Sequence, residues 1–256
     1  DLAKLESLTV AFSGGVDSAL VAAAARQALG KQMVAVFIHS PVELEEALIS
    51  ARRTAQEADF ELVVIDYNDL ELEEFRANLV DRCYTCKLNR FGRLVEYARV
   101  HGYAALAEGS NADDVGQYRP GSRAVEELAV LSPLKDAGLH KFEIRALAQG
   151  MGLSVWDRPS APCLATRFPY GSTITAKGLA QVGQAEMILK RMGFRNVRVR
   201  HHQQLASIEV AQDQIEQLIQ QRDAIAHAFS GIGFSHTAVD LQGYRSGSLD
   251  EGINKP

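Results

Sequence analysis

The fold is decided by one stretch near the N-terminus, Leu8-Thr-Val-Ala-Phe-Ser13-Gly14-Gly15-Val-Asp17-Ser18, which leads into an alanine- and leucine-rich segment ending at Leu29. Residues 8–12 are typical of a short β-strand, and the alanine-rich segment is typical of a helix. The paired glycines let the backbone turn tightly and approach a ligand closely. The start of the helix offers free N–H groups. The stretch therefore predicts a strand–turn–helix unit with an anion-binding turn.

Three further apolar runs have strand character, at residues 33–38, 61–66 and 103–107. Helix-forming segments at 43–58 and 87–99 separate them. Apolar strands that alternate with helices predict a parallel sheet with right-handed crossovers. We therefore expect an α/β fold with a doubly wound parallel sheet, and ligands beyond the carboxyl ends of its strands.

The pattern changes at a group of prolines, Pro159, Pro162 and Pro169. Proline fixes φ and cannot donate to a strand ladder, so this region is predicted to be a rigid connector. We predict a nucleotide-binding domain over residues 1–158, the connector over 159–172, and a small α+β domain over 173–256. Within the small domain we expect helices at 175–192 and 213–229, and strands at 196–201, 205–210 and 234–240.

Composition and charge exclude several classes of protein. The chain has 256 residues, three cysteines and a formal net charge of −5. A chain with this charge has no overall positive field to hold long nucleic acid, so we do not expect a nucleic-acid partner. Its longest apolar run, residues 19–25, is far shorter than the ~18 residues of a membrane span. An odd, small number of cysteines suits a reducing compartment, and we expect a cytoplasmic protein.

The glycine turn can be interpreted in two ways. It lacks the lysine of the GxxxxGK[ST] loop, so that nucleotide-hydrolase motif is absent. Asp17 would repel a phosphate unless it caps the helix or holds a magnesium ion between itself and the phosphate. The plainer alternative is a strand–helix turn whose Asp and Ser only cap the helix.

Cys83 and Cys86 form a C-x-x-C pair, and Cys163 lies in the proline connector. Two thiolates three residues apart can bind neighbouring corners of one metal site, and the fold must bring the third. Three thiolates suit a [4Fe–4S] cluster with one iron left open. A Cys₃His zinc site, a thioredoxin-type redox pair and simply buried cysteines are alternatives.

Two features of the small domain carry charge. Arg198 and Arg200 alternate along a predicted strand, so both guanidinium groups share a face and suit a phosphate or two carboxylates. The alternative is the solvated face of an edge strand. Glu186 falls on an apolar helix stripe with Val182 and Leu189. If it is sheltered from water, its pKa should rise, which suits general acid–base catalysis.

The Ser-Gly-Gly-Val-Asp-Ser turn resembles the signature of the PP-loop ATP pyrophosphatases. The resemblance implies ATP cleavage between the α and β phosphates, which leaves an adenylated substrate. It implies that Ser40, after the second strand, lies near the adenine. It also implies a second nucleotide loop after the fourth strand, in which Asp113 and Asp114 either serve magnesium or lie in a solvated turn. The ATP-binding residues implied in this way are Ser13, Gly14, Gly15, Asp17, Ser18, Ser40, Gly109 and Asn111.

Five motifs together resemble the LarE family, which makes the pincer nucleotide that holds nickel in lactate racemase. They are Cys83-Tyr-Thr-Cys-Lys87, Gln117-Tyr-Arg-Pro-Gly121, Ala165-Thr-Arg-Phe-Pro-Tyr-Gly171, Val197-Arg-Val-Arg200 and Gly243-Tyr-Arg-Ser-Gly247. The resemblance implies ATP-dependent conversion of a pyridinium dicarboxylate mononucleotide to its thiocarboxylate. It implies Cys163 and Glu186 as catalytic residues, and Arg198 and Arg200 as ligands of the substrate phosphate. It also implies a homo-oligomer, a hexamer.

Some LarE members carry only the cysteine that matches Cys163 and give up its sulfur. This chain has all three cysteines. It therefore resembles the members that bind a [4Fe–4S] cluster and transfer sulfur catalytically, from sulfide or another small donor. Other readings stay open: a PP-loop tRNA thiolase with a three-cysteine cluster, an ammonia-using synthetase of the same fold, and a nucleotide-binding regulator without catalysis.

Overall fold

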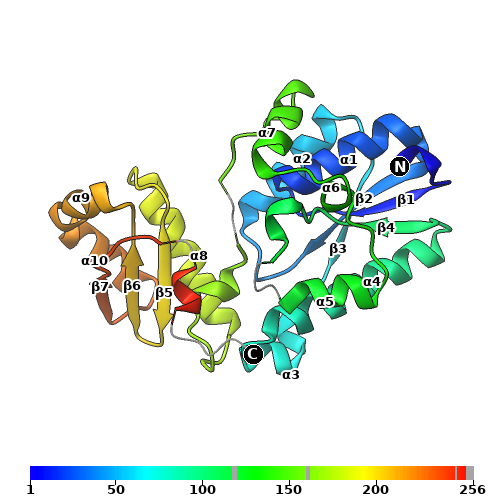
Figure 1. The fold of residues 1–256 in the computed structure, drawn as a ribbon. Coiled ribbons are helices and arrows are strands. Elements are labelled where there is room, and N and C mark those ends of the chain that lie inside the picture. Colours follow the sequence, from blue (N-terminus) through cyan, green and yellow to red (C-terminus); the bar gives the residue numbers. More distant parts are fainter. Residues whose placement is uncertain (117–119, 160–161, 246, 252–256) are drawn as a thin grey trace. The chain divides into compact units, whose positions relative to one another are not determined.

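The computed structural model describes residues 1–116, 120–159, 162–245 and 247–251. It divides the chain into two compact units (Figure 1). Unit 1 comprises Asp1–Asn68 and Asp81–Ala161, and unit 2 comprises Asp69–Val80 and Pro162–Pro256. Each unit is described by itself. The predicted domain limits stay a prediction, and nothing in the local sequence pattern indicates that Asp69–Val80 joins unit 2.

Unit 1 is built on a parallel sheet of four strands in the order β3-β2-β1-β4. Leu8 of β1 pairs with Met33 on one side and with Ala105 on the other. The predicted parallel α/β sheet is confirmed. Its strands are β1 (Leu8–Ala11), β2 (Met33–His39), β3 (Leu62–Asp66) and β4 (Ala105–Ala107).

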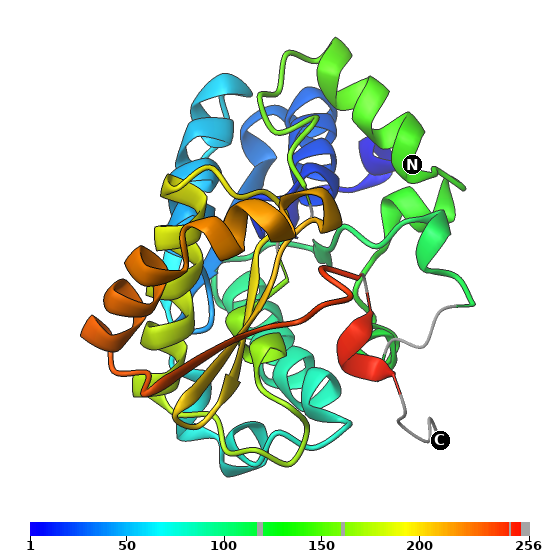
Figure 2. The ribbon, with the colours of Figure 1, turned by 90° about the vertical axis from the view of Figure 1, so that its left-hand side faces the viewer.

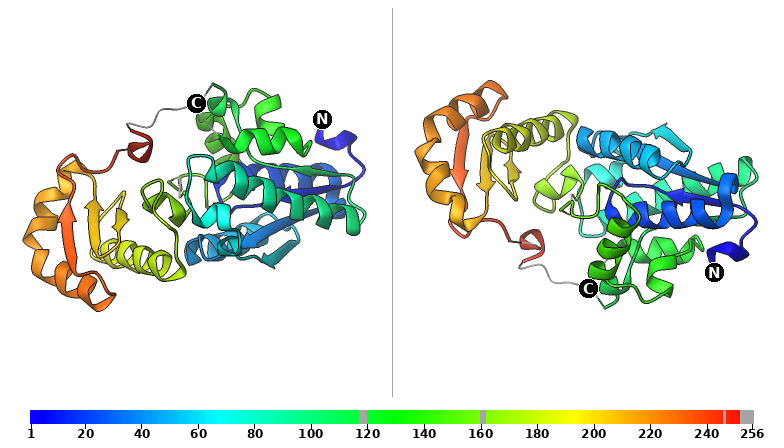
Figure 3. Two further views of the ribbon diagram at one scale, coloured as in Figure 1. Left: turned by 90° about the horizontal axis from the view of Figure 1, so that it is seen from below. Right: turned by 90° about the horizontal axis from the view of Figure 1, so that it is seen from above.

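Helices cover both faces of this sheet (Figure 3). Alternate residues of β2 face opposite ways: Ala35 packs in one core cluster with α1 and α7, and Val36 packs in another with α4 and α5. This period of two, with both faces apolar, is what a doubly wound sheet requires. The helices of unit 1 are α1 (Val16–Leu29), α2 (Glu45–Glu57), α4 (Arg82–Val100), α5 (Pro120–Glu127), α6 (Pro133–Asp136) and α7 (Lys141–Gly150).

Helix α4 begins earlier than the sequence pattern predicts, at Arg82 instead of residue 87. Its first turn is held by contacts with α5: the Tyr84 hydroxyl donates to Glu127 at 2.8 Å, and the Arg123 guanidinium lies 3.5 Å from the centre of the Tyr84 ring. Local periodicity cannot reveal such contacts. The consequence is that both cysteines of the C-x-x-C pair lie on a helix.

Unit 2 has a sheet of three strands in the order β5-β6-β7, seen face-on in Figure 1 and from its side in Figure 2. Strand β5 is antiparallel to β6, whereas β7 is parallel to β6. The second, smaller α+β unit is therefore present. Its helices and strands are α3 (Glu73–Arg76), α8 (Ala176–Arg191), β5 (Arg198–His202), β6 (Leu205–Glu209), α9 (Ile215–Gln220), α10 (Arg222–Gly231) and β7 (His236–Val239).

One helix predicted over residues 213–229 is wrong in its continuity. The structure has two helices, α9 and α10, joined at Gln221, whose backbone (φ −99°, ψ 13°) leaves the α-helical region. Short 3-10 turns complete the chain: η1 (Leu2–Lys4), η2 (Gly30–Gln32), η3 (Asp69–Glu71), η4 (Ala112–Asp114), η5 (Leu164–Arg167), η6 (Gln212–Gln214) and η7 (Ser248–Asp250).

Asn78 explains why an early segment belongs to unit 2. It is fully buried, and its side-chain amide donates to the carbonyls of Phe168, Pro169 and Ser172 at 3.3, 2.8 and 3.0 Å. Its backbone has φ of +56°, a conformation that asparagine tolerates better than most residues. The Asn78 carbonyl in turn accepts a hydrogen bond from the Gly171 N–H. Asn78 thus fixes the loop that leads into α8.

In the part of the chain that the structure describes, no helix is long and apolar enough to cross a membrane.

Candidate active site

The turn between β1 and α1 is built around two glycines and two serines. Gly14 has φ of +72°, and a Cβ there would lie 2.8 Å from the carbonyl oxygen of Ala47 in α2. Only glycine therefore lets the turn pack against α2. The Ser13 N–H donates to the Ser18 hydroxyl at 3.2 Å, and that hydroxyl donates to the Gly15 carbonyl at 3.1 Å. These contacts hold the first N–H groups of α1 at the carboxyl edge of the sheet.

The loop after β4 lies directly against this turn. A Cβ on Gly109 would lie 2.8 Å from the backbone nitrogen of Ser18. The side-chain amide of Asn111 donates to Oδ1 of Asp17 at 3.0 Å. The structure therefore brings together the two loops that were predicted to bind the nucleotide, although they are far apart in the sequence.

Lys141 is a site residue that the sequence analysis did not single out. It is the first residue of α7, and its Nζ forms an ion pair with Oδ2 of Asp17. Lysine is unfavourable at the positive end of a helix, and this position is the one signal that the sequence offered. Asp17 is therefore neutralised by Lys141, which removes the repulsion that an isolated aspartate would exert on a phosphate.

Asp113 and Asp114 make capping contacts. Asp113 accepts from Nδ1 of His140 at 2.6 Å and from the backbone N–H of Lys141 at 2.8 Å. The hydrogen bond with His140, followed by that with the Lys141 N–H, lowers the pKa of Asp113, and the hydrogen bond with Asp113 raises the pKa of His140. Asp114 accepts from the Asn111 N–H at 3.1 Å. Together these contacts fix the second loop to the start of α7, which carries Lys141.

A cavity of about 630 Å³ opens at the carboxyl ends of the strands of unit 1. This volume lies in the usual range for small-molecule sites. Of the residues described, Ser40 is not among those that line it. Ser40 is buried, and its carbonyl accepts from the N–H of Glu43, which does line the cavity. The polar and thiol side chains of the lining include Ser13, Asp17, Ser18, Glu43, Cys86, Lys87, Arg90, Glu108, Asn111 and Lys141.

Cys83 and Cys86 lie in the first turn of α4, three residues apart and both half-buried. This spacing puts the two thiols on neighbouring positions of one helix face. Cys86 and the adjacent Lys87 line the cavity, and the Lys87 Nζ lies 3.7 Å from a carboxylate oxygen of Glu108. Cys163 belongs to unit 2. Among the described residues, no group of three or more His, Cys, Asp or Glu side chains is arranged to hold a metal ion.

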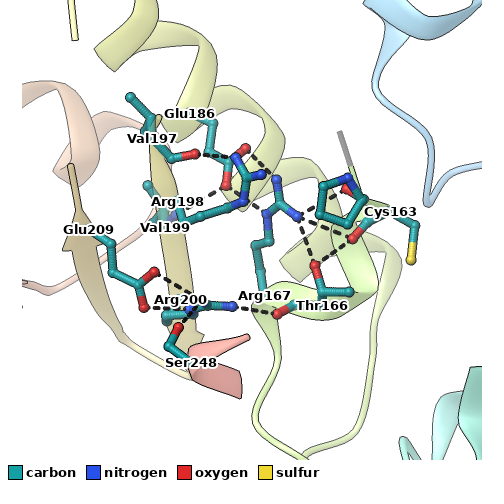
Figure 4. Close-up of polar contacts among 11 residues, drawn as sticks. Cys163, Thr166, Arg167, Glu186, Val197, Arg198, Val199, Arg200, Glu209 and Ser248 are labelled. Carbon is teal, nitrogen blue, oxygen red and sulfur yellow. Dashed lines mark hydrogen bonds and ion pairs between the residues drawn. The ribbon is translucent and has the colours of Figure 1, made fainter. Parts of the chain in front are cut away.

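Glu186 of α8 is buried opposite Arg167, another residue to which the sequence analysis gave no role. Both side chains are 0% exposed. The Arg167 Nε and Nη2 donate to the two oxygens of Glu186 at 2.7 and 2.8 Å, and the N–H of Val199 donates to Oε1 at 3.1 Å (Figure 4). The acid–base role of Glu186 stays a prediction. Its observed contacts are those of a support for Arg167 and for β5.

Arg198 and Arg200 extend from the same side of β5, as Figure 4 shows. Arg200 donates through Nε and Nη2 to both oxygens of Glu209, at 2.6 and 2.9 Å, and through Nη1 to the carbonyl of Thr166 at 2.7 Å. Arg198 donates to the Val197 carbonyl at 2.7 Å. Burial, followed by the nearby charge of Arg167, lowers the pKa of Arg198. The surroundings of Arg198 are therefore electropositive.

Comparison with known proteins agrees with this geometry. Residues 2–91 match the NAD synthase family. The chain is 36% identical over 257 residues to the pyridinium-3,5-bisthiocarboxylic acid mononucleotide synthase of Lactiplantibacillus plantarum, covering 99% of this chain and 92% of the relative. It is 39% identical over 254 residues to the uncharacterized protein slr1717 of Synechocystis, covering 98% and 95%. It is 31% identical over 204 residues to a glutamine-hydrolyzing GMP synthase of Methanoculleus marisnigri, covering 75% and 63%.

Of the five motifs that carry the family resemblance, residues 117–119 and 246 lie outside the described residues. The other motif residues lie in the two units as described above. The near full-length similarity to the Lactiplantibacillus synthase and the PP-loop turn at the end of β1 together show that the chain belongs to the LarE family of PP-loop, ATP-dependent sulfur transferases.

Proposed function

We propose that this enzyme adenylates a carboxylate of a pyridinium dicarboxylate mononucleotide and then replaces AMP by sulfur, which gives the thiocarboxylate. The printed name of the Lactiplantibacillus relative supports this substrate. One observation in this chain carries the proposal furthest. The PP-loop turn, Lys141 and a cysteine, Cys86, all line the same cavity, so nucleotide and sulfur chemistry meet in one place.

Adenylation solves a chemical problem. A carboxylate is a poor electrophile, because attack on it adds negative charge to an anion. Transfer of AMP to the carboxylate removes that charge and supplies a good leaving group. In this proposal the N–H groups at the start of α1 donate to the phosphates of ATP. Lys141 and Lys87 offset the charge that develops as the carboxylate oxygen attacks the α phosphorus and pyrophosphate leaves.

Unit 2 would hold the phosphate end of the substrate. The electropositive surroundings of Arg198 support a role in anion binding. Arg200 is fixed by Glu209 and by the Ser248 hydroxyl, which accepts from Nη2 at 2.8 Å. A guanidinium held in this way presents its remaining N–H group without further loss of side-chain entropy. Binding a remote phosphate supplies positioning energy for the reacting carboxylate.

Metal sites remain part of the proposal. Cys83 and Cys86, one helical turn apart and half-buried, fit two neighbouring thiolate ligands, and Cys163 would supply the third. A [4Fe–4S] cluster bound there would supply an open iron that carries exchangeable sulfur, from sulfide or another small donor. Asp17 offers carboxylate oxygens to Mg²⁺, and one of these oxygens also pairs with Lys141. A cytoplasmic location and a hexameric assembly are proposed on the family resemblance.

The test is anaerobic purification, with assays for iron and acid-labile sulfide, followed by incubation with ATP, sulfide and the dicarboxylate mononucleotide. The proposal expects pyrophosphate, AMP and thiocarboxylate in equal amounts over many turnovers. Bulk tRNA in place of the mononucleotide should give no thiolated product. Repeated turnover by a protein free of metal would contradict the cluster, and absence of pyrophosphate release would contradict the adenylation step.

A further inference from the structure

The fully buried guanidinium of Arg167 uses all three of its nitrogens. Nε and Nη2 bind the carboxylate of Glu186. Nη1 donates to the Pro162 carbonyl at 3.0 Å, to the Cys163 carbonyl at 3.3 Å and to the Thr166 hydroxyl at 2.8 Å. One side chain therefore connects the backbone on which Cys163 stands to helix α8.

The carbonyl of Cys163 is held unusually well for a loop residue. Besides Arg167, it accepts from the N–H of Thr166 at 3.1 Å and from the Thr166 hydroxyl at 2.8 Å. Cys163 is the residue that precedes η5, and its side chain points away from this polar network in Figure 4. The network thus fixes the backbone and leaves the sulfur outside it.

The other end of the network reaches the arginines of β5. Glu186 accepts from the N–H of Val199, which lies between Arg198 and Arg200. The Thr166 carbonyl accepts from Arg200. A continuous chain of charge-assisted hydrogen bonds therefore runs from the Cys163 backbone to the strand proposed to hold the substrate phosphate.

Stability alone does not explain a buried ion pair of this kind. Removing two charges from water is costly, and well-packed apolar residues of the same volume often stabilise a protein as much or more. What the pair supplies is geometry: the planar fork of arginine fixes directions as well as distances.

We propose that Arg167 is a positioning residue, which holds the Cys163 thiol in one orientation relative to β5 by fixing the backbone of Pro162 and Cys163. Glu186 acts through Arg167 in this role. The inference rests on the proposed function in one respect, the use of Cys163 in sulfur transfer. Holding a reacting group in place in advance lowers the entropic part of the barrier.

The first experiment does not depend on the reaction. In the full chain with Cys83→Ser and Cys86→Ser, Cys163 is the one remaining cysteine. Its rate of alkylation by iodoacetamide is measured with and without Arg167→Lys, alongside the urea midpoint. Lysine keeps the charge but loses the fork, so the loop opens locally, and we expect alkylation about tenfold faster. The matched control is Arg195→Lys, in the exposed pair with Asp213, which should leave the rate unchanged.

An unchanged alkylation rate in folded Arg167→Lys would overturn the proposal. If that variant does not fold, Glu186→Gln decides, because it keeps the shape of the side chain and weakens the hold on Arg167. A rise of about threefold is expected there, and an unchanged rate would count against the proposal.

The second experiment uses the three-cysteine enzyme with ATP, sulfide and the mononucleotide. Arg167→Lys should lower the thiocarboxylate formed per pyrophosphate released, because adenylation continues while sulfur transfer slows. An equal fall of both products would indicate a merely structural role and overturn the proposal. If the parent releases no pyrophosphate, the proposed function fails, whereas the alkylation result still decides the role of Arg167.

Discussion

The close approach of Gly109 to the start of α1 gives the sharpest prediction. In Gly109→Ala, the new methyl group would lie 2.8 Å from the Ser18 nitrogen, 3.1 Å from the Asp17 carbonyl carbon and 3.1 Å from the Asp17 Cβ. Two of these atoms are backbone, so the loop or the helix must move. Overpacking of this kind costs roughly 1–3 kcal/mol. The displacement would separate Asn111 from Asp17 and misplace the N–H groups that face the phosphates.

We therefore expect Gly109→Ala to weaken ATP binding by about tenfold or more and to lower Tm by several degrees. Isothermal titration calorimetry and calorimetric melting measure the two effects. The control is Gly150→Ala at the end of α7, where an added Cβ meets no atom within 4 Å. That change should leave ATP affinity unaltered. Parental ATP affinity in Gly109→Ala would refute the proposed contact between the second loop and the nucleotide.

Three further predictions follow from the site. Lys141→Met should slow pyrophosphate release at saturating ATP by about a hundredfold, since a preorganised charge near the phosphates is lost, and a change under twofold would contradict this role. The raised pKa of His140 means that its pair with Asp113 stabilises the fold fully below the ordinary histidine value of 6.5 and less as pH rises through the raised value. The urea midpoint of the parent should accordingly fall over that window relative to His140→Asn. Cys83→Ala should abolish multiple turnover while ATP binding persists, and undiminished turnover would argue against thiolate ligation by Cys83.

The sheet of unit 1 could be predicted because its strands are apolar on both faces, and the glycine turn is a local pattern. Glu186 was placed on an apolar stripe, and its burial is observed. What the sequence did not reveal are its partners. Arg167 and Glu186 lie 19 residues apart, and Lys141 and Asp17 lie 124 apart. Ion pairs at such separations are created by tertiary packing and leave no periodic signal.

The same reason explains the differences in the helices. The first turn of α4 depends on contacts of Tyr84 with α5, so propensity alone started the helix too late. The predicted pairing of Arg198 and Arg200 on one face follows from the strand period of two. That Glu209 fixes Arg200 depends on the antiparallel register of β5 and β6, in which Arg198 faces Glu209 across the strands. Sequence could not supply that register.

The early segment anchored by Asn78 has a consequence for how this protein can be made and dissected. Its amide donors are synthesised some ninety residues before the carbonyls that they bind, at separations of 90, 91 and 94. During translation, unit 2 therefore cannot close until the ribosome has passed Ser172. A fragment cut from Pro162 onward would lack its own clamp. A recombinant version of this half would need Asp69–Val80 grafted back, for example by circular permutation.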